Sequence, residues 1–242
     1  MYAADSVLTG SLSLKDLAHA KISAYADSDL GGDIWTTKST TGYWIELTCL
    51  NGRTFPLAWA ARFQGSTSTH TCESETVALC DALKREIIPL QSLLKVLLKR
   101  EVEAEVFEDN SACMTSVHKG YSPSMRYIGR TQRVSLGFLH DTCDVESQKA
   151  GSDSARRLST DPLYSGAKPV ALKKVGTDTQ KADLFTKDLD KVRFNQLAEL
   201  IGMRRQKTNK MQMIASMKAL VQQSRSSNVF FDKSIVMLDD MD

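Results

Sequence analysis

Cysteine and histidine are scarce in this chain of 242 residues, which contains five cysteines and four histidines. The number of cysteines is odd and no C-x-x-C pair occurs, so neither a disulfide framework nor a zinc ribbon is indicated. The histidines lack the H-x-x-x-H spacing that would place two imidazole rings on one helical face to bind zinc. These absences disfavour the common zinc sites and favour a reducing compartment.

Long apolar runs and an excess of charge of one sign are also missing. No run reaches the roughly 18–20 apolar residues that a membrane-spanning helix needs. The first residues, MYAADSVLTGSLSLKD, carry early acids and no apolar core of signal-peptide length. Lys and Arg number 31 against 29 for Asp and Glu, a balance that excludes neither an enzyme nor a nucleic-acid-binding protein. We expect an intracellular protein, cytoplasmic or nuclear, that makes no contact with a membrane.

Hydrophobic residues make up 42% of the chain, which suits one globular domain with appendages. Segments rich in β-branched and aromatic residues at 21–25, 40–48 and 53–61 predict strands. The second and third flank Asn51-Gly52, a pair that favours a hairpin because both residues tolerate the positive φ of a type I′ turn. Three antiparallel strands are therefore predicted near the start of the chain.

Helical spacing follows this hairpin. Apolar residues three and four apart predict a helix from about residue 73 to residue 98, with Thr71 as its N-cap and Pro89 dividing it. A β-like segment comes next at 103–109, and a further helix is predicted to open at residues 109–111. The first half of the chain is thus predicted to form three strands, a helix, a strand and a further helix.

The later part of the chain adds a predicted strand at 168–175 and a helical pattern from about residue 180 to residue 203. Together these elements predict an α/β fold of one sheet flanked by helices. Residues 144–166 are rich in Ser, Asp, Gly, Lys and Arg, which is typical of a solvated insertion. Residues 205–242 form a C-terminal extension in which apolar residues share one helical face.

Four acidic residues fall where such a fold would gather them. Asp27 ends the first strand and Asp109 ends the fourth, while Glu75 and Asp183 lie in first turns of predicted helices. Strand ends and helix starts can converge at one edge of a sheet, where open α/β sheets place their sites. A single Asp at a strand end is more often a turn or cap residue than a metal ligand. Spacing alone leaves both interpretations open.

Several carboxylates packed together repel one another unless cations neutralise them. Mg²⁺ suits such a cluster because it is a hard, octahedral cation that binds a few carboxylates and keeps waters and phosphate oxygens. Two such ions about 4 Å apart can activate a water and stabilise the leaving oxygen in phosphodiester cleavage. If the four acids converge, we expect a site for two Mg²⁺ ions, with Mn²⁺ as an alternative metal.

A basic and aromatic segment follows Asp109 in the chain. Its cationic residues could hold a nucleic-acid backbone by electrostatic attraction. A solvated helix face explains the same residues equally well. The residues concerned are Lys119, Arg126, Arg130 and Arg133.

Six short words around the four acids resemble the ribonuclease H domain of copia-type retrotransposon polyproteins. They occur in the order of that family and at close to its spacing. The words are YADSDLGGD (25–33) for a YSDADWAGD-like word, KSTTGY (38–43) for KSTSGY, LAWAARFQ (57–64) for ISWSSKKQ, TCESETVAL (71–79) for STEAEYIAL, EDNSACM (108–114) for a CDNQSA-like word and TDTQKADLFTK (177–187) for TDEQLADIFTK.

The resemblance covers about residues 20–203 and implies a ribonuclease H-like α/β fold, with a five-stranded mixed sheet flanked by helices. The implied domain spans 21–204, with the insertion at 144–166, between an N-terminal extension (1–20) and a C-terminal extension (205–242). Carried over residue by residue, Asp27, Glu75, Asp109 and Asp183 fall on the family's four metal-binding acids. Glu73 and Asp29, which lie in the same words, are weaker candidates for metal ligands than these four.

The function implied is that of a metal-dependent endonuclease that hydrolyses the RNA strand of an RNA–DNA hybrid, leaving 5′-phosphate and 3′-hydroxyl ends. Its partners would be the hybrid, read through the 2′-hydroxyls of the RNA strand, and a reverse transcriptase domain or larger assembly contacted through residues 205–242. Two departures support an alternative. The segment at 130–141 lacks the family's usual histidines, and the tail has no counterpart. The alternative is a catalytically silent ribonuclease H-like module reused for nucleic-acid binding or scaffolding.

Overall fold

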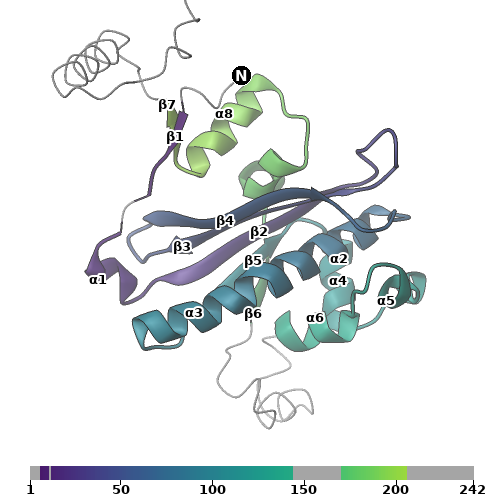
Figure 1. Ribbon diagram of the computed structural model, residues 1–242, viewed down its shortest axis with the longest axis horizontal. Coiled ribbons are helices and arrows are strands. Elements are labelled where there is room, and N and C mark those ends of the chain that lie inside the picture. The colour runs from purple at the N-terminus through teal and green to yellow at the C-terminus, as the bar shows by residue number, and fades with distance from the viewer. Residues whose placement is uncertain (1–5, 11, 144–169, 206–242) are drawn as a thin grey trace, which may run out of the picture. The chain divides into compact units, whose positions relative to one another are not determined.

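The computed structural model describes residues 6–10, 12–143 and 170–205, drawn in colour in Figure 1. The chain divides into two compact units, Leu8–Arg204 and a second unit made of residues 1–7 and 205–242. The fold described here is that of the first unit. The expected insertion at 144–166 and residues 206–242 of the expected C-terminal extension lie outside the described residues. The domain boundaries drawn from the sequence stay a prediction.

A five-stranded mixed sheet forms the centre of this unit, in the order β4-β3-β2-β5-β6. Strands β2, β3 and β4 pair antiparallel, whereas β5 runs parallel to both β2 and β6. Helices flank the sheet, so the expected α/β fold class is confirmed. The strands are β2 (Lys21–Asp29), β3 (Thr40–Thr48), β4 (Thr54–Phe63), β5 (Ala104–Glu108) and β6 (Val170–Lys174).

The β3–β4 hairpin forms as predicted, but its turn is not of type I′. The register pairs Thr48 with Thr54, which leaves a loop longer than two residues. Gly52 has a φ of 76°, and Asn51 is not among the residues with positive φ. A type I′ turn needs positive φ at both central residues, so the longer loop places only the glycine in the left-handed region.

Two successive helices cover one face of the sheet (Figure 1). They are α2 (Thr71–Ala82) and α3 (Ile88–Leu98), joined by a π-helical turn, η1 (Leu83–Ile87). Pro89 lies in the first turn of α3, directly after the π-helical turn, so the helical segment is not broken into two separate helices at this residue. The expected N-cap was one residue off, because the His70 ring, rather than Thr71, accepts the hydrogen bond from the Glu73 N–H.

The core lies between these helices and the apolar side of the sheet. Ile22, Ala24 and Ala26 of β2 are fully buried and pack in one cluster with residues of α2 and β5. Since successive strand residues point to opposite faces, Asp27 faces away from that core. Four shorter elements follow β5, namely α4 (Ser111–Lys119), η2 (Pro123–Met125), α5 (Ile128–Thr131) and α6 (Leu136–Cys143).

The helix predicted from about residue 180 to residue 203 is interrupted. The chain forms two 3-10 turns, η3 (Thr177–Thr179) and η4 (Lys181–Phe185), and only then α8 (Lys191–Leu200). Asp190 caps a new helix by accepting a hydrogen bond from the Arg193 N–H at 2.8 Å. Long-range side-chain bonds to the sheet fix η4 as an element distinct from α8.

Three features fix η4 on β2 and β3. The buried Lys181 ammonium pairs with Glu46 of β3 at 2.5 Å, and the Gln180 amide donates to the Ala26 carbonyl at 2.8 Å. Gly42 lies directly opposite Asp27 in the β2–β3 register. A Cβ atom on Gly42 would lie 2.5 Å from Thr186 Cγ2 and 2.9 Å from Phe185 Cβ. The lack of a side chain at Gly42 therefore lets η4 approach the strand that carries Asp27.

The remaining elements are short. Ser13 and Asp16 form a reciprocal capping box at α1 (Leu14–Leu17), and the other two strands are β1 (Ser6–Leu8) and β7 (Met203–Arg205). All five cysteines are free thiols. Among the helices of the described ranges, none combines the length and the apolar character that crossing a membrane requires.

Replacing Gly42 with alanine should displace η4, because the new methyl group meets Phe185 and Thr186 at less than contact distance. We expect the free energy of unfolding, measured by chemical denaturation, to fall by about 1–3 kcal/mol. Gly65→Ala is the matched control, since a Cβ there has no neighbour within 4 Å. Equal stability of the two variants would contradict the close approach of η4.

Candidate metal centre

The four acids predicted as ligands come from four different elements. Asp27 lies near the carboxyl end of β2, and Asp109 directly follows the parallel strand β5. The carboxyl ends of parallel strands meet at the same edge of a sheet, which brings these two side chains together. Glu75 lies in the second turn of α2, one turn later than expected, and Asp183 lies in η4.

The structure gathers these acids into two groups that share Asp109. Asp27, Asp109 and Asp183, which we call the aspartate group, each place a carboxylate oxygen within 4.8 Å of the other two. Glu75, Glu108 and Asp109, the glutamate group, meet the same limit. All four predicted residues are thus brought together, and a fifth acid joins them. Their role as metal ligands stays a prediction.

Lys187 lies against the aspartate group. Its ammonium donates to Asp183 Oδ1 at 2.7 Å and to Asp27 Oδ1 at 3.1 Å. The Thr186 hydroxyl donates to the other Asp27 oxygen. Partial burial would lower the pKa of Lys187, but the two carboxylates outweigh this effect and raise its pKa. Lys187 therefore supplies a positive charge to this group, on a side chain that is 36% exposed.

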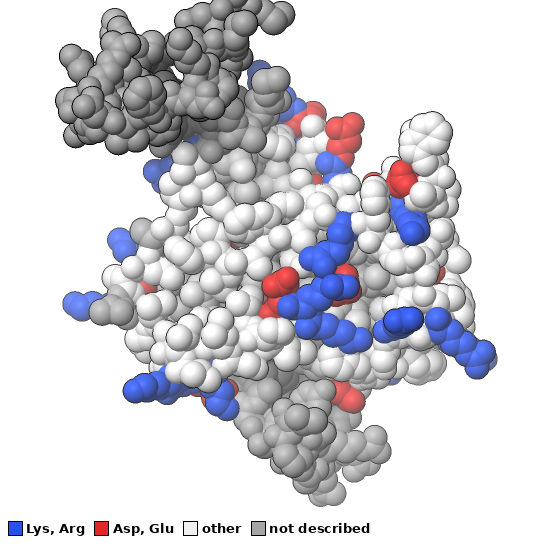
Figure 2. Space-filling model, in the orientation of Figure 1, with Lys and Arg blue, Asp and Glu red and all other residues white. Residues whose placement is uncertain are grey.

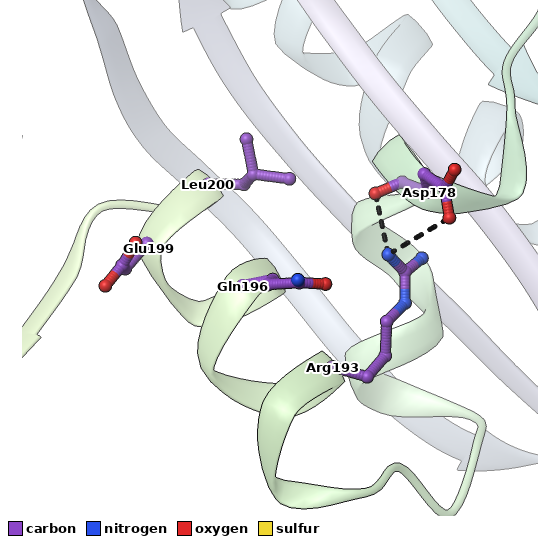
Figure 3. Close-up of a pocket in the computed structure, with 5 residues that line it drawn as sticks. All are labelled: Asp178, Arg193, Gln196, Glu199 and Leu200. Atoms are coloured by element: carbon purple, nitrogen blue, oxygen red, sulfur yellow. Dashed lines mark hydrogen bonds and ion pairs between the residues drawn. The ribbon is translucent and has the colours of Figure 1, made fainter.

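Arg193 of α8 supports Asp183 from the other side, at 3.5 Å from its Oδ2. Arg193 also donates to the Asp178 carbonyl at 2.8 Å and lines an open pocket with Asp178, Gln196, Glu199 and Leu200 (Figure 3). Because these bonds engage the guanidinium, the pocket offers no free cation to a ligand. We regard Arg193 as a residue that positions Asp183.

Burial changes the acidity of the acids in both groups. It raises the pKa of Asp27 to about 6, against the lowering effects of Lys187 and Thr186. Burial also raises the pKa of Glu75 to about 10, reinforced by the charges of Glu108 and Asp27. Buried carboxylates without enough positive charge nearby hold protons that a cation could replace.

Glu108 was missed in the sequence. It is the last residue of β5, where Ala104 and Val106 point into the core, and its side chain is fully buried on that same side. Burial raises its pKa well above the usual value of a carboxyl. Strand alternation places an apolar residue at this position. An acid at a core-facing position was the signal that could have identified it.

Glu73, the weaker candidate in the same word as Glu75, lies outside both groups. Burial would raise its pKa, but hydrogen bonds from Thr69 and Tyr127 outweigh this effect and lower the pKa. Both of these bonds measure 2.8 Å and reach Glu73 Oε2. Glu73 thus ties α5 and the loop before α2 together. Asp29 is likewise outside both groups.

The predicted basic residues are all exposed. Ser66 donates to the Thr131 carbonyl at 2.8 Å and Gln132 donates to the Ser66 carbonyl at 3.0 Å, which ties α5 to the loop before α2. Figure 2 shows Lys and Arg side chains in a band that crosses this face from α2 towards α5. The set consists of Lys119, Arg126, Arg130 and Arg133.

The raised pKa values predict how the stability of the metal-free protein, measured in the presence of a chelator, depends on pH. Burial raises the pKa of Asp27 from an ordinary value of 3.8 to about 6. It raises the pKa of Glu75 from 4.5 to about 10. These two carboxyls therefore bind more protons in the folded state, so their contribution to stability is greatest at low pH and falls as pH rises towards their folded pKa values. We expect the melting temperature in EDTA to drop between about pH 5 and about pH 8. The double variant Asp27→Asn/Glu75→Gln should flatten this slope, and a wild-type melting temperature that rises over the interval would contradict the assignment.

A search against family models finds no match. The chain is 26% identical over 184 residues to the retrovirus-related Pol polyprotein from transposon TNT 1-94 of Nicotiana tabacum, a match that covers 75% of this chain. It spans only 11% of the length of that relative.

Two solved ribonuclease H1 structures were also matched, each at 15% identity. The enzyme from Halobacterium salinarum NRC-1 gives a TM-score of 0.39 over 68% of this chain and 93% of its own. LC11-RNase H1, isolated from compost, gives 0.35 over 74% of this chain and 91% of its own. The match to the tobacco transposon confirms that the chain resembles copia-type retrotransposon Pol polyproteins.

Proposed function

We propose that this chain is a metal-dependent endonuclease that hydrolyses the RNA strand of RNA–DNA hybrids. The observation that carries the proposal is the pair of acid groups joined through Asp109. The similarity to a retrovirus-related Pol polyprotein from a transposon supports it, together with the six sequence words that resemble a ribonuclease H domain. The bound metal, the hybrid substrate and the hydrolytic activity are all parts of what we propose.

The side chains present fit a hard divalent cation. Every donor in both groups is a carboxylate oxygen, the type that Mg²⁺ and Mn²⁺ prefer over the nitrogen and sulfur ligands of zinc. One buried oxygen of Glu75, Oε2, has no hydrogen-bond partner among the described residues. A buried acceptor without a donor is costly, and a bound cation would remove that cost.

Two ions bound by these groups would supply an activated water and neutralise the charge on the scissile phosphate. The chain's own residues hold the arrangement in place. Asp109 links the two groups, and Arg193 and the Glu46–Lys181 pair keep Asp183 facing Asp27. The Lys187 ammonium lies between Asp27 and Asp183, and its partly exposed side chain can swing outward when a cation takes its place.

The substrate would lie across the acids and the basic surface. Lys119, Arg126, Arg130 and Arg133 are exposed and can neutralise backbone phosphates. The hydrogen bonds of Ser66 and Gln132 fix α5 to the start of the helix that carries Glu75. A hybrid held there would present its RNA strand, with its 2′-hydroxyls, to the acids.

The same basic surface supports a second candidate function, a catalytically silent module that binds nucleic acid. Lys187 is the observation that favours it, since an ammonium already neutralises Asp27 and Asp183. The two functions differ in one respect. Both predict binding of a hybrid, whereas only the first predicts metal-dependent hydrolysis.

The test is cleavage of an RNA–DNA hybrid labelled on its RNA strand, measured in Mg²⁺ and in EDTA. We expect wild type to cut only in the presence of metal and to leave 5′-phosphate and 3′-hydroxyl ends. Asp109→Asn should lower the rate by at least about a hundredfold, because Asp109 belongs to both groups. Asp188→Asn is the matched control, since Asp188 is an exposed aspartate outside both groups.

The outcomes separate the two functions. Absence of metal-dependent cleavage by folded wild-type protein, together with tight hybrid binding, supports the silent module and overturns the nuclease. Equal cutting by wild type and Asp109→Asn would also contradict the proposed site.

A further inference from the structure

Glu108 is an acid at a position of β5 that faces the hydrophobic core. Its neighbours on the same side of β5, Ala104 and Val106, are 3% and 0% exposed and belong to the core cluster. Glu108 is itself 0% exposed. The copia-type word that this segment resembles begins with cysteine at the position of Glu108. A buried ionisable acid in place of a small apolar residue is costly unless it has a partner.

The partners of Glu108 account for only one of its oxygens. Oε1 accepts a hydrogen bond from the Asn110 N–H at 3.0 Å. Oε2 is buried and has no hydrogen-bond partner among the described residues, and the same is true of Glu75 Oε2. Two unpartnered carboxylate oxygens thus lie in one group whose ligand atoms are all within 4.8 Å of one another.

The cation that pairs with the aspartate group makes no ion pair with Glu75 or Glu108, and its charge only partly opposes the raised pKa of Glu108. The Lys187 ammonium donates to Asp27 and Asp183. Over the described ranges, the ion pairs include none between a Lys or Arg and Glu75 or Glu108. Among the described residues, the glutamate group therefore has three carboxylates and no ion pair of the kind that Lys187 makes in the aspartate group.

We propose that Glu108 is a metal ligand, and that Glu108, Glu75 and Asp109 bind one divalent cation in the absence of nucleic acid. Three carboxylates leave open positions on an octahedral ion for waters or a phosphate oxygen. The third carboxylate adds the charge that holds the ion before any phosphate arrives. The inference rests on the proposed function, since Asp109 belongs to both groups.

The experiment is a calorimetric titration of the full chain with Mn²⁺, without nucleic acid, for wild type, Glu108→Gln and Glu105→Gln. Glutamine keeps the shape of Glu108 and its acceptor for the Asn110 N–H, but it removes the charge. We expect the tighter Mn²⁺ site of wild type to weaken by at least about tenfold in Glu108→Gln. Glu105→Gln neutralises an acid of the same strand outside both groups and should bind as wild type does.

Thermal unfolding with and without Mn²⁺ provides the second measurement. Glu108→Gln should be at least as stable as wild type in EDTA, because it removes a buried acid, and should gain less from Mn²⁺. If Glu108→Gln does not fold, Glu108→Asp replaces it. Aspartate keeps the charge but shortens its reach, so we expect weakened Mn²⁺ binding, and wild-type affinity would overturn the inference.

The failures are distinguishable. If wild type binds Mn²⁺ and cuts hybrid while Glu108→Gln binds Mn²⁺ with unchanged affinity, Glu108 is not a ligand and the proposed function stands. If wild type binds no Mn²⁺ and cuts no hybrid, both proposals fail.

Discussion

Repulsion among carboxylates is the constraint on which the rest of this structure depends. The carboxyl ends of β2 and β5, the second turn of α2 and the η4 turn bring five acids together in two groups joined at Asp109. Like charges at this spacing cannot all ionise without positive charge nearby. One group has the Lys187 ammonium, and the other has buried oxygens with no donor. The buried carboxylate oxygens without a donor are what point to bound cations.

The scaffold holds the acids in place against this repulsion. Helix α2 packs into the apolar cluster of the sheet, which fixes Glu75. Turn η4 is secured differently, by the buried Glu46–Lys181 pair and by close approach to Gly42. Breaking a buried ion pair by removing one partner is strongly destabilising. The position of Asp183 therefore depends on residues of β3 that take no part in the chemistry.

Sequence pattern predicted those strands and helices whose formation depends mainly on neighbouring residues in the chain. The strand at 40–48 has the predicted bounds, because β-branched and aromatic residues fill both of its faces. The helix predicted from about residue 180 was wrong at its start, since long-range bonds of Gln180 and Lys181 turn that segment into η4, whereas its later part forms α8. Such bonds leave no periodic trace in the sequence. The resemblance located Asp27, Glu75, Asp109 and Asp183, whereas Glu108 departs from the family's word and was found only through its burial.

The most direct test of the account is a crystal structure of the chain grown with Mn²⁺, with the ions located by anomalous scattering. The account predicts two anomalous peaks, one bound by Asp27, Asp109 and Asp183 and one bound by Glu75, Glu108 and Asp109. Well-ordered acids with no peak at either group, or Mn²⁺ bound only elsewhere on the surface, would contradict it.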